Sequence, residues 1–318
     1  MHVPSSIRTQ YGKITALFAA SLVLYYFQIL PASRNLPSQI TTSMSENRQL
    51  PNKIWYKLGP RGLTEETRNW TQTCIDLNPE AEHEFMTDAL GDEWVARVYA
   101  DNATIVQTYL NLTIPILKAD FLRYLLLFAD GGVYLDLDVT CHVPIKDWVP
   151  EEYRSNASLV VGWEFDVGWG EAIIREFATW TIISKPRSPH LWSLVMDIMD
   201  FFEAKRLEVG VDSVAELTLA MVGDIVDATG PRRFTRSILT SLGKSMEGEE
   251  PVDVNTIKNL REPNLVEDVL ILPGFSFAAE SNHWPPDWTL TPPLVTHHGL
   301  GSWKNEHGGE QHGSVTSK

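Results

Sequence analysis

The segment from Ile114 to Thr140, "IPILKADFLRYLLLFADGGVYLDLDVT", joins the most regular helical pattern of the chain to a hydrophobic strand that carries two aspartates. Pro115 suits an early position of that helix, and Gly131 and Gly132 suit its end. The apolar positions that recur at helical spacing are Ile116, Leu117, Phe121, Leu125 and Phe128. The segment therefore predicts a helix that leads directly into a strand.

The strand, "YLDLDVT", raises a question of charge. Because strand side chains alternate between faces, its leucines and valine would face a core, whereas Tyr134, Asp136 and Asp138 would share the opposite face. Two carboxylates on one face repel each other unless a cation, a proton or water separates them. The pattern therefore predicts a positive charge on this face.

Strand and helix patterns alternate along the rest of the chain. The strand patterns are "LPNKIWYK", "EHEFMTD", "SLVVGWEFD", "EDVLILPGFSFA" and "LVTHHGLGSWK". Helical patterns cover residues 64–79, with Thr64 as the cap, and residues 171–183, 188–204 and 213–228. This alternation predicts a layered α/β fold.

The amino-terminal region predicts a membrane anchor. Residues 14–30, "ITALFAASLVLYYFQIL", are uncharged and follow Arg8 and Lys13, which favours a signal anchor with a cytosolic tail at 1–13 and everything after it in the lumen. A cleaved signal peptide is the alternative. We expect a polar stem at 31–49, a folded luminal domain at 50–305 and a disordered tail at 306–318.

Composition limits the partners. The chain has 318 residues, of which 43% are hydrophobic, and a formal net charge of −15. This charge argues against nucleic acid as a partner, although it leaves room for a phosphorylated small substrate held through a metal ion.

Two further features agree with a luminal location. The sequons for N-glycosylation begin at Asn69, Asn102, Asn111 and Asn156. Cys74 and Cys141 are the only cysteines, and whether they pair stays open at this point.

Two kinds of chemistry use Asp-x-Asp at the end of a strand. Haloacid-dehalogenase-like phosphatases have a D-x-D-x-[TV] strand that supplies a nucleophile and a general acid, and "DLDVT" fits it. In nucleotide-sugar glycosyltransferases, D-x-D binds a divalent ion that bridges the two phosphates of the donor. The simplest alternative is a solvated strand face without a ligand.

The residues before the acidic strand favour the second chemistry. Asp120 and Arg123 lie three positions apart, hence on one helix face, where they could also form only an ion pair. The segment "LKADFLRYLLLFADGGVYLDLDV" closely resembles the signature of glycosyltransferase family 32, the fungal Golgi α-mannosyltransferase group. The resemblance extends over about residues 50–305 and includes "NPEAEHEF", "FATWTIISKPRSPHLWSLV" and "HHGLGSWK". It disfavours the phosphatase, which explains neither the helix nor the anchor.

The resemblance implies roles for several residues. Asp136 and Asp138 match the motif that binds the metal ion and diphosphate, and together with Arg123 they are the residues expected to carry the reaction. Asp120 and Arg123 match a pair that contacts the donor sugar and its diphosphate, and Tyr134 lines the same site.

Other matches lie near the two ends of the domain. Trp55 matches an aromatic residue near the donor base, and Trp303 matches one near the diphosphate. His297 or His298 matches a histidine that completes the metal shell, and imidazole suits Mn²⁺. The doublet leaves open which of the two is the ligand. Residue chemistry alone makes Glu164 and Asp166 candidates for the acceptor side.

The resemblance also implies the fold and the activity. We expect a GT-A-like nucleotide-sugar-binding fold, with a mixed, mostly parallel sheet in a single catalytic domain. The implied activity is Mn²⁺-dependent, retaining transfer of mannose from GDP-mannose to a protein N-glycan in the Golgi, within a complex of mannosyltransferases. Alternatives are mannosyl transfer to inositol-phosphoceramide, a UDP-sugar donor, and a catalytically silent glycan-binding protein.

Overall fold

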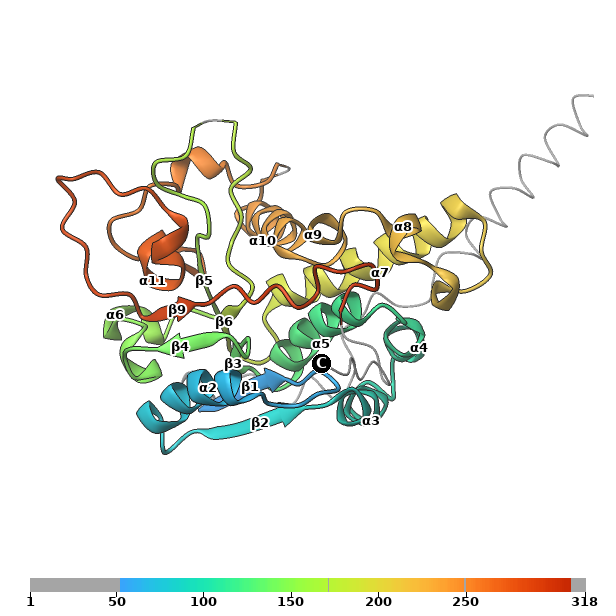
Figure 1. Cartoon of the computed structure of the whole chain (residues 1–318). Coiled ribbons are helices and arrows are strands. Elements are labelled where there is room, and N and C mark those ends of the chain that lie inside the picture. The colour runs from blue at the N-terminus through green and yellow to red at the C-terminus, as the bar shows by residue number, and fades with distance from the viewer. Residues whose placement is uncertain (1–51, 171, 249, 310–318) are drawn as a thin grey trace, which may run out of the picture. The chain divides into compact units, whose positions relative to one another are not determined.

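The structure is a computed structural model that describes residues 52–170, 172–248 and 250–309 (Figure 1). Its centre is a seven-stranded sheet in the order β2-β1-β3-β6-β5-β8-β7. These strands are β1 (Lys53–Lys57), β2 (Glu82–Met86), β3 (Gly132–Leu135), β5 (Leu159–Gly162), β6 (Thr181–Ser184), β7 (Asn264–Val266) and β8 (Val269–Leu272). A separate antiparallel pair joins β4 (Val139–Cys141) to β9 (Val295–His297).

Helices lie against the sheet and beyond its edges (Figure 1). The longer ones are α2 (Glu65–Leu77), α3 (Asp88–Val98), α4 (Ala103–Asn111), α5 (Pro115–Ala129), α7 (Pro189–Val209) and α10 (Pro231–Ser245). Short helices are α6 (Glu151–Arg154), α8 (Leu219–Val222), α9 (Ile225–Ala228) and α11 (Gly274–Ala278). The expected α/β architecture with a mixed central sheet is confirmed.

The sheet is less parallel than expected. Within the described residues, three of its neighbouring strand pairs are parallel and three are antiparallel. The main reason is β6, which lies antiparallel between β3 and β5 in a region where the sequence predicts a helix at 171–183. All four residues of β6 are buried, and a short apolar run of this kind fits a buried strand as well as a helix.

Helix α5 forms as its sequence predicts. Pro115 is its first residue, and every residue from Asp120 to Phe128 is buried. Gly131 and Gly132 have φ of 68° and 107°, values that favour glycine. A Cβ on Gly132 would lie 2.6 Å from the carbonyl oxygen of Lys53, so this glycine lets β3 approach β1 closely.

The acidic strand is shorter than predicted. Strand β3 ends at Leu135, Asp136 to Asp138 form a turn, and β4 begins at Val139. The expectation that both aspartates share a strand face is therefore wrong. The turn is closed by a hydrogen bond from the Val139 N–H to the Asp136 carbonyl oxygen at 3.3 Å, and it projects both carboxylates from the carboxyl end of β3.

Cys74 and Cys141 form a disulfide that joins α2 to β4. The question that the sequence left open is thus answered by the fold, which brings two cysteines 67 positions apart in the chain to a Cα–Cα distance of 4.8 Å. The Cys141 N–H also donates to the Thr73 hydroxyl at 3.0 Å. Since β4 directly follows the acidic turn, the disulfide fixes one side of that turn to α2.

Replacing both Cys74 and Cys141 by alanine is expected to lower the free energy of unfolding by about 4 kcal/mol, because the unfolded chain loses a long covalent loop. Chemical denaturation of the oxidised protein and the double variant measures the difference. An unchanged unfolding free energy would show that the pair contributes no constraint.

The ends of the expected domain are only partly described. Residues 306–309, assigned above to a tail, pack against α5: the Gly308 carbonyl oxygen accepts the Ile116 N–H at 2.9 Å. The ordered domain therefore extends at least to Gly309. The cytosolic tail, anchor and stem that we expect within residues 1–49 lie outside the described residues. Residues 310–318 also lie outside them. Among the residues that the structure describes, no helix is both long and apolar enough to cross a membrane.

Candidate active site

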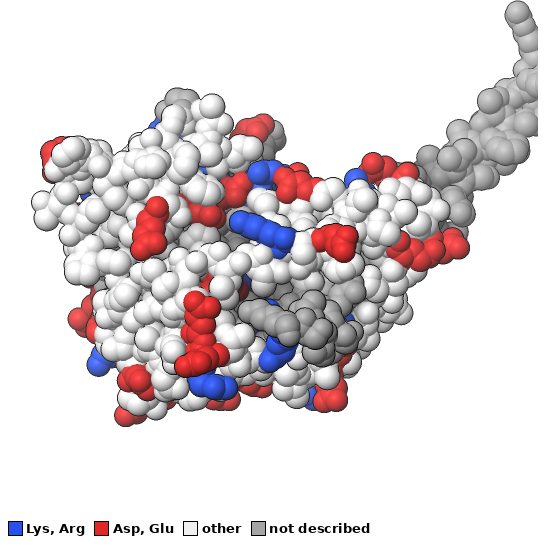
Figure 2. Space-filling model, viewed as in Figure 1, with Lys and Arg blue, Asp and Glu red and all other residues white. Residues whose placement is uncertain are grey.

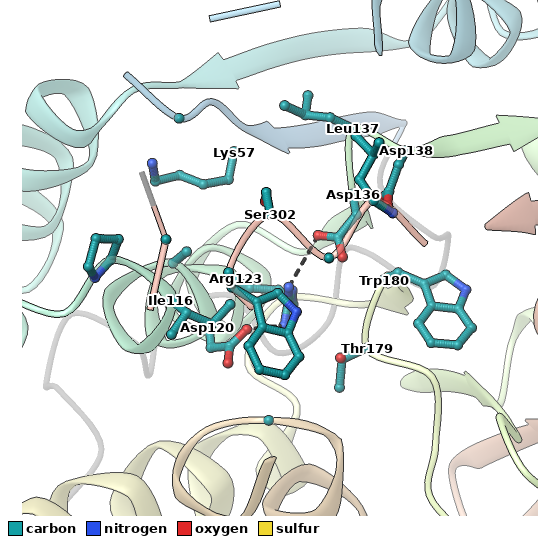
Figure 3. A pocket seen from close by; sticks show the side chains of 18 of the residues that line it. Lys57, Ile116, Asp120, Arg123, Asp136, Leu137, Asp138, Thr179, Trp180 and Ser302 are labelled. Atoms are coloured by element: carbon teal, nitrogen blue, oxygen red, sulfur yellow. Dashed lines mark hydrogen bonds and ion pairs between the residues drawn. The ribbon is translucent and has the colours of Figure 1, made fainter. Parts of the chain in front are cut away.

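A cavity of about 520 Å³ lies at the carboxyl ends of β1 and β3. Its walls come from the amino-terminal half of α5, the acidic turn, the segment after β5 and the segment from His297 to Gly309. In Figure 3, Arg123 and Asp136 lie in the middle, Lys57 and Ile116 lie to one side, and Thr179 and Trp180 lie to the other. The cavity therefore brings together residues that lie far apart in the sequence, from Lys57 to Gly309.

Arg123 links helix α5 to the acidic turn. One of its terminal nitrogens, Nη1, lies 2.7 Å from Oδ1 of Asp120, and the other, Nη2, lies 3.2 Å from Oδ1 of Asp136. Its guanidinium carbon is 4.6 Å from the centre of the Tyr134 ring. Asp120 and Arg123 thus form an ion pair within the helix. Arg123 also contacts the acidic turn, and both residues line the cavity.

Burial and neighbouring charges together shift the pKa values of Asp120 and Arg123. Asp120 and Arg123 are each 4% exposed. Burial raises the pKa of Asp120 to about 6, against the opposite effects of Arg123 and the Thr229 hydroxyl. Burial alone would lower the pKa of Arg123, but Tyr134, Asp136 and Asp120 raise it well above its ordinary value. Arg123 thus stays positively charged beside the acidic turn and supplies part of the charge that the sequence requires.

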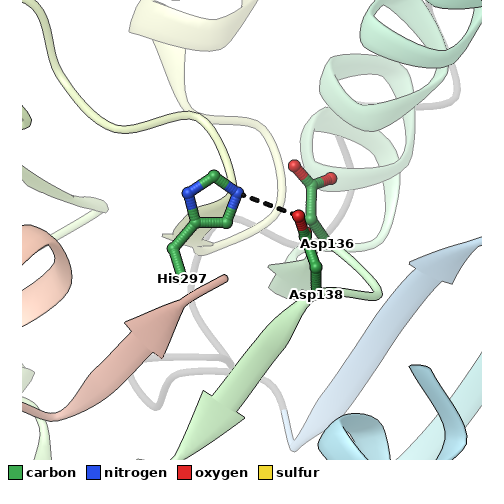
Figure 4. A group of neighbouring side chains, drawn as sticks. All are labelled: Asp136, Asp138 and His297. Atoms are coloured by element: carbon green, nitrogen blue, oxygen red, sulfur yellow. Dashed lines mark ion pairs between the residues drawn. The ribbon is translucent and has the colours of Figure 1, made fainter. Parts of the chain in front are cut away.

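His297 completes a cluster of ligand atoms with the two aspartates (Figure 4). One potential ligand atom from each of Asp136, Asp138 and His297 lies within 4.8 Å of the others. His297 Nε2 is 3.3 Å from Oδ2 of Asp138, and the same oxygen accepts the Leu300 N–H at 2.8 Å. Against the effect of burial, His297 lowers the pKa of Asp138, and Asp138 raises that of His297. Two carboxylates and an imidazole suit a divalent ion such as Mn²⁺.

The pairing of β4 with β9 distinguishes the two histidines. Val139 lies opposite His297, which places that imidazole beside the acidic turn, with its ring stacked on Trp180 at 4.1 Å. His298 points elsewhere: its ring stacks on Trp70 at 4.2 Å, and its Nε2 lies 2.8 Å from the Thr140 hydroxyl. Of the doublet, only His297 belongs to the cluster and to the cavity wall.

Replacing His297 by alanine is expected to reduce enzymatic activity about a hundred-fold or more, because His297 would be one of three side chains that hold a divalent ion. His298→Ala is the matched control and should stay within about three-fold of the wild type, since its partners lie outside the cluster. Initial rates at saturating Mn²⁺ measure both. Equal losses in the two variants would contradict this assignment.

The remaining expected site residues divide into two groups. Tyr134, Trp303 and Glu164 line the cavity. Trp55 does not: its ring is fully buried, its Nε1–H donates to the Gly131 carbonyl oxygen at 2.8 Å, and its edge packs on Trp94. Trp55 thus fills the core in the middle of β1 and does not line the cavity, and its expected role near the donor base stays a prediction.

Asp166 is buried and does not line the cavity either. It is 0% exposed, and its Oδ1 accepts the Asn259 N–H at 2.6 Å. Its own N–H donates to the Asn282 side-chain oxygen at 2.7 Å. Asp166 fixes the segment after β5, whereas Glu164, two positions earlier, faces the cavity.

The structure adds cavity residues that the sequence did not reveal. Glu176 is 5% exposed and Thr179 is 7% exposed, and both line the cavity beside Trp180. The Glu164 N–H donates to the Glu176 carbonyl oxygen at 2.8 Å, which holds the two segments together. Burial, followed by the charge of Glu176, raises the pKa of Glu164 to about 7. No pattern pointed to these residues, since Glu176 and Thr179 fell within the helix expected at 171–183.

Comparison with known proteins agrees with this geometry. Residues 64–155 match the family described as a glycosyltransferase sugar-binding region containing a DXD motif. The chain is 33% identical over 270 residues to the initiation-specific alpha-1,6-mannosyltransferase of Schizosaccharomyces pombe, a match that covers 81% of this chain and 64% of that protein.

A protein of the same name from Candida albicans is 29% identical over 304 residues, with 87% of this chain and 78% of that protein covered. A mannosyl phosphorylinositol ceramide synthase of Saccharomyces cerevisiae is 32% identical over 92 residues, which cover 29% of this chain and 23% of that protein. The family match includes the acidic turn, Arg123 and Asp120. The chain therefore belongs to the glycosyltransferases whose sugar-binding region contains a DXD motif, which is here Asp136-Leu137-Asp138.

Proposed function

We propose that this protein transfers mannose from GDP-mannose to a glycan with retention of the anomeric configuration. The observation that carries the proposal is the cluster of Asp136, Asp138 and His297 in the wall of one cavity, beside the Arg123–Asp120 pair. The choice of mannose rests on similarity to proteins named as mannosyltransferases over most of the chain. Retention rests on the family resemblance.

The residues present fit a divalent metal ion. Asp136, Asp138 and His297 would hold it, and the ion, Mn²⁺ in this proposal, would act as a Lewis acid and as a template for the diphosphate. Arg123 would contact a diphosphate oxygen, and its pair with Asp120 supports this role by orienting the guanidinium. Lys304 and Trp303 also line the cavity and would contact the same group.

The acceptor would enter from the side of Glu164. We propose front-face substitution, in which the acceptor hydroxyl oxygen forms its bond to C1 of the sugar as the bond from C1 to the diphosphate breaks. The hydroxyl proton passes to the departing phosphate oxygen, and the new bond lies on the face that the phosphate leaves. Glu164 accepts a hydrogen bond from another acceptor hydroxyl. Glu176 is held by Arg232, at 3.1 Å, which makes it a poor nucleophile.

The surface charge agrees with a small nucleotide-sugar donor. In Figure 2, Lys and Arg side chains lie singly among Asp and Glu on the described part of the face shown. Such a surface offers no continuous basic stripe to a nucleic acid backbone. The cavity itself is lined by basic as well as acidic side chains, and Arg123, Lys57 and Lys304 are among the basic ones.

Donor screening tests the proposed function. The purified full-length protein would be incubated with Mn²⁺, an oligomannoside acceptor and either GDP-mannose, UDP-glucose or UDP-N-acetylglucosamine. We expect transfer from GDP-mannose alone. Turnover of a UDP-sugar would favour the alternative donor, and binding of the acceptor without turnover of any donor would favour a silent glycan-binding protein.

We also propose that residues 14–30 anchor the protein in the Golgi membrane, with the catalytic domain in the lumen and other mannosyltransferases as partners. The disulfide and the exposed positions of Asn69, Asn111 and Asn156 support luminal exposure.

The anchor leads to a direct expectation for protein purified from its native host. The mature chain should retain residues 1–30, sediment with membranes and remain there in alkaline carbonate, because the segment is long enough to span a thin bilayer. Amino-terminal sequencing and carbonate extraction measure this. A mature chain that begins near residue 33 would identify a cleaved signal peptide.

A further inference from the structure

We infer that the segment Glu164–Trp169 forms an acceptor-binding ledge that takes neutral sugar residues of a glycan chain beyond the residue that receives mannose. The inference rests on the proposed function and extends it, because it places the acceptor on named residues and selects a neutral glycan over a phosphate-bearing lipid headgroup. The ledge begins in the cavity, where Glu164 and Phe165 form part of the wall, and continues outward to Trp169.

The ledge is held rigidly from behind by Asn282. This side chain is 7% exposed, and its oxygen accepts the N–H groups of Asp166 and Val167 at 2.7 and 2.8 Å. Its amide nitrogen donates to the carbonyl oxygens of Glu164 and Ala278, both at 2.9 Å. The segments after β5 and after α11 thus form one unit, and they run side by side in Figure 1. A binding surface gains affinity when its shape is fixed in this way before the ligand arrives.

The outward part of the ledge is aromatic. The ring of Trp169 lies edge-to-face with Phe165 at 5.3 Å and tilted against His283 at 4.9 Å. Its Nε1–H donates to the Ser281 carbonyl oxygen at 2.8 Å, so the indole is fixed in orientation while part of its ring stays accessible. Gly168, with φ of 78°, brings this turn close to the His283 backbone. Fixed, partly exposed aromatic faces suit the apolar C–H faces of sugar rings.

The charge of the ledge selects the type of acceptor. Glu164 and Glu176 line this side of the cavity, and Arg232 is engaged by Glu176 at 3.1 Å and by Asp224 at 2.8 Å. Two carboxylates therefore hold this guanidinium, and Glu164 adds a further acidic side chain to the same side of the cavity. Carboxylates accept hydrogen bonds from hydroxyl groups but repel a phosphate. A neutral oligosaccharide fits this environment better than an inositol phosphate headgroup.

Calorimetric titration of the full-length protein with a neutral α-linked mannose oligosaccharide tests the ledge. We expect Trp169→Ala to weaken binding by about ten-fold, while the affinity for a single methyl mannoside stays the same. His283→Ala removes an exposed side chain that the fold does not need, and it should weaken oligosaccharide binding a few-fold. Trp192→Ala on α7, which removes a ring tilted against Phe128 at 5.0 Å, is the control and should bind as the wild type does.

The outcomes separate the inference from the proposed function. Oligosaccharide binding that is unchanged in both Trp169→Ala and His283→Ala would overturn the ledge. So would a wild-type protein that binds inositol phosphate more tightly than the oligosaccharide. Turnover of GDP-mannose, measured in the same preparations, should be equal in the wild type and in the ledge variants when methyl mannoside is the acceptor. Oligosaccharide binding that depends on Trp169 without any turnover of GDP-mannose would support the ledge and reject the proposed donor.

Discussion

Asp138→Asn is expected to reduce mannosyl transfer by about a thousand-fold, and EDTA should reduce wild-type transfer to the same level. The asparagine removes one negative charge from a cluster of two carboxylates and one imidazole, and loss of a charged partner in a desolvated site costs about 2–5 kcal/mol. Mn²⁺ should restore the EDTA-treated wild type better than Ca²⁺, because the smaller ion accepts carboxylate and imidazole ligands together. Initial rates before and after metal addition measure both effects.

The variants Asp138→Asn and Asp138→Ala should differ in stability. The Asp138 carboxylate accepts the Leu300 N–H at 2.8 Å and pairs with His297. The repulsion between the two aspartates is therefore offset within the protein itself. Asp138→Asn keeps an acceptor for the Leu300 N–H, whereas Asp138→Ala removes this hydrogen bond to a charged group, which contributes about 1.5–3 kcal/mol.

Thermal melting in EDTA distinguishes loss of charge from loss of fold. Asp138→Asn should melt close to the wild type, and Asp138→Ala should melt lower. Added Mn²⁺ should raise the melting temperature of the wild type but not of Asp138→Asn, since only a folded state that binds the ion is stabilised by it. Full transfer in EDTA, or an Asp138→Asn protein that turns over donor as the wild type does, would contradict the metal site. Asp136 and Asp138 would then be solvated turn residues without a ligand.

The sequence predicts those parts of the site that depend on local chemistry. Thr64 caps α2 as expected, its hydroxyl accepting the Thr67 N–H at 3.1 Å. Pro115 begins α5, and Gly131, with a positive φ, directly follows its C-cap Asp130. Each of these signals lies within a few residues of the feature that it determines. Arg123 and Asp120 follow from the same local rule, because residues three apart on a helix share a face.

Other parts of the site depend on contacts between distant segments. The choice between His297 and His298 follows from the antiparallel register of β4 and β9, two strands that lie far apart in the sequence. A shift of one residue would exchange the two side chains between faces of the strand. Glu176 reaches the cavity because its segment runs beside Glu164. No periodicity within either segment encodes these pairings.

Two of the expected site residues, Trp55 and Asp166, do not line the cavity, because aromatic and acidic residues can serve the interior as well as a site. Trp55 is aromatic and lies in the first strand, but its ring fills the space between Trp94 and the Gly131 carbonyl oxygen. Asp166 is acidic and follows a strand, but its carboxylate accepts a backbone N–H in the interior. A side chain near a site takes part in it only when its direction brings it there, and direction depends on the tertiary fold.

Arg123→Lys is expected to reduce transfer by about a hundred-fold or more although the charge is kept. The guanidinium contacts Asp120 and Asp136 with different nitrogens, at 2.7 and 3.2 Å, and a lysine ammonium cannot reproduce that fork. Asp120→Asn should also lose about thirty- to a thousand-fold, because it removes the charge that orients Arg123. Its side chain can still accept the Thr229 hydroxyl, which lies 2.9 Å from Oδ2 in the wild type. Rates at saturating donor, together with near-ultraviolet circular dichroism, measure activity and fold in the same samples.

An ion pair of the same spacing on the surface provides the matched control. Glu203 and Arg206 on α7 are also three apart, at 2.7 Å, but they lie on an exposed face and outside the cavity wall. Glu203→Gln should therefore leave transfer unchanged, because removing an exposed pair disturbs neither the fold nor the site. If Arg123→Lys and Asp120→Asn leave the transfer rate unchanged, as Glu203→Gln should, the pair in α5 is only a structural ion pair. If transfer is lost while the circular dichroism spectrum is kept, Arg123 acts through its placement between helix α5 and the acidic turn.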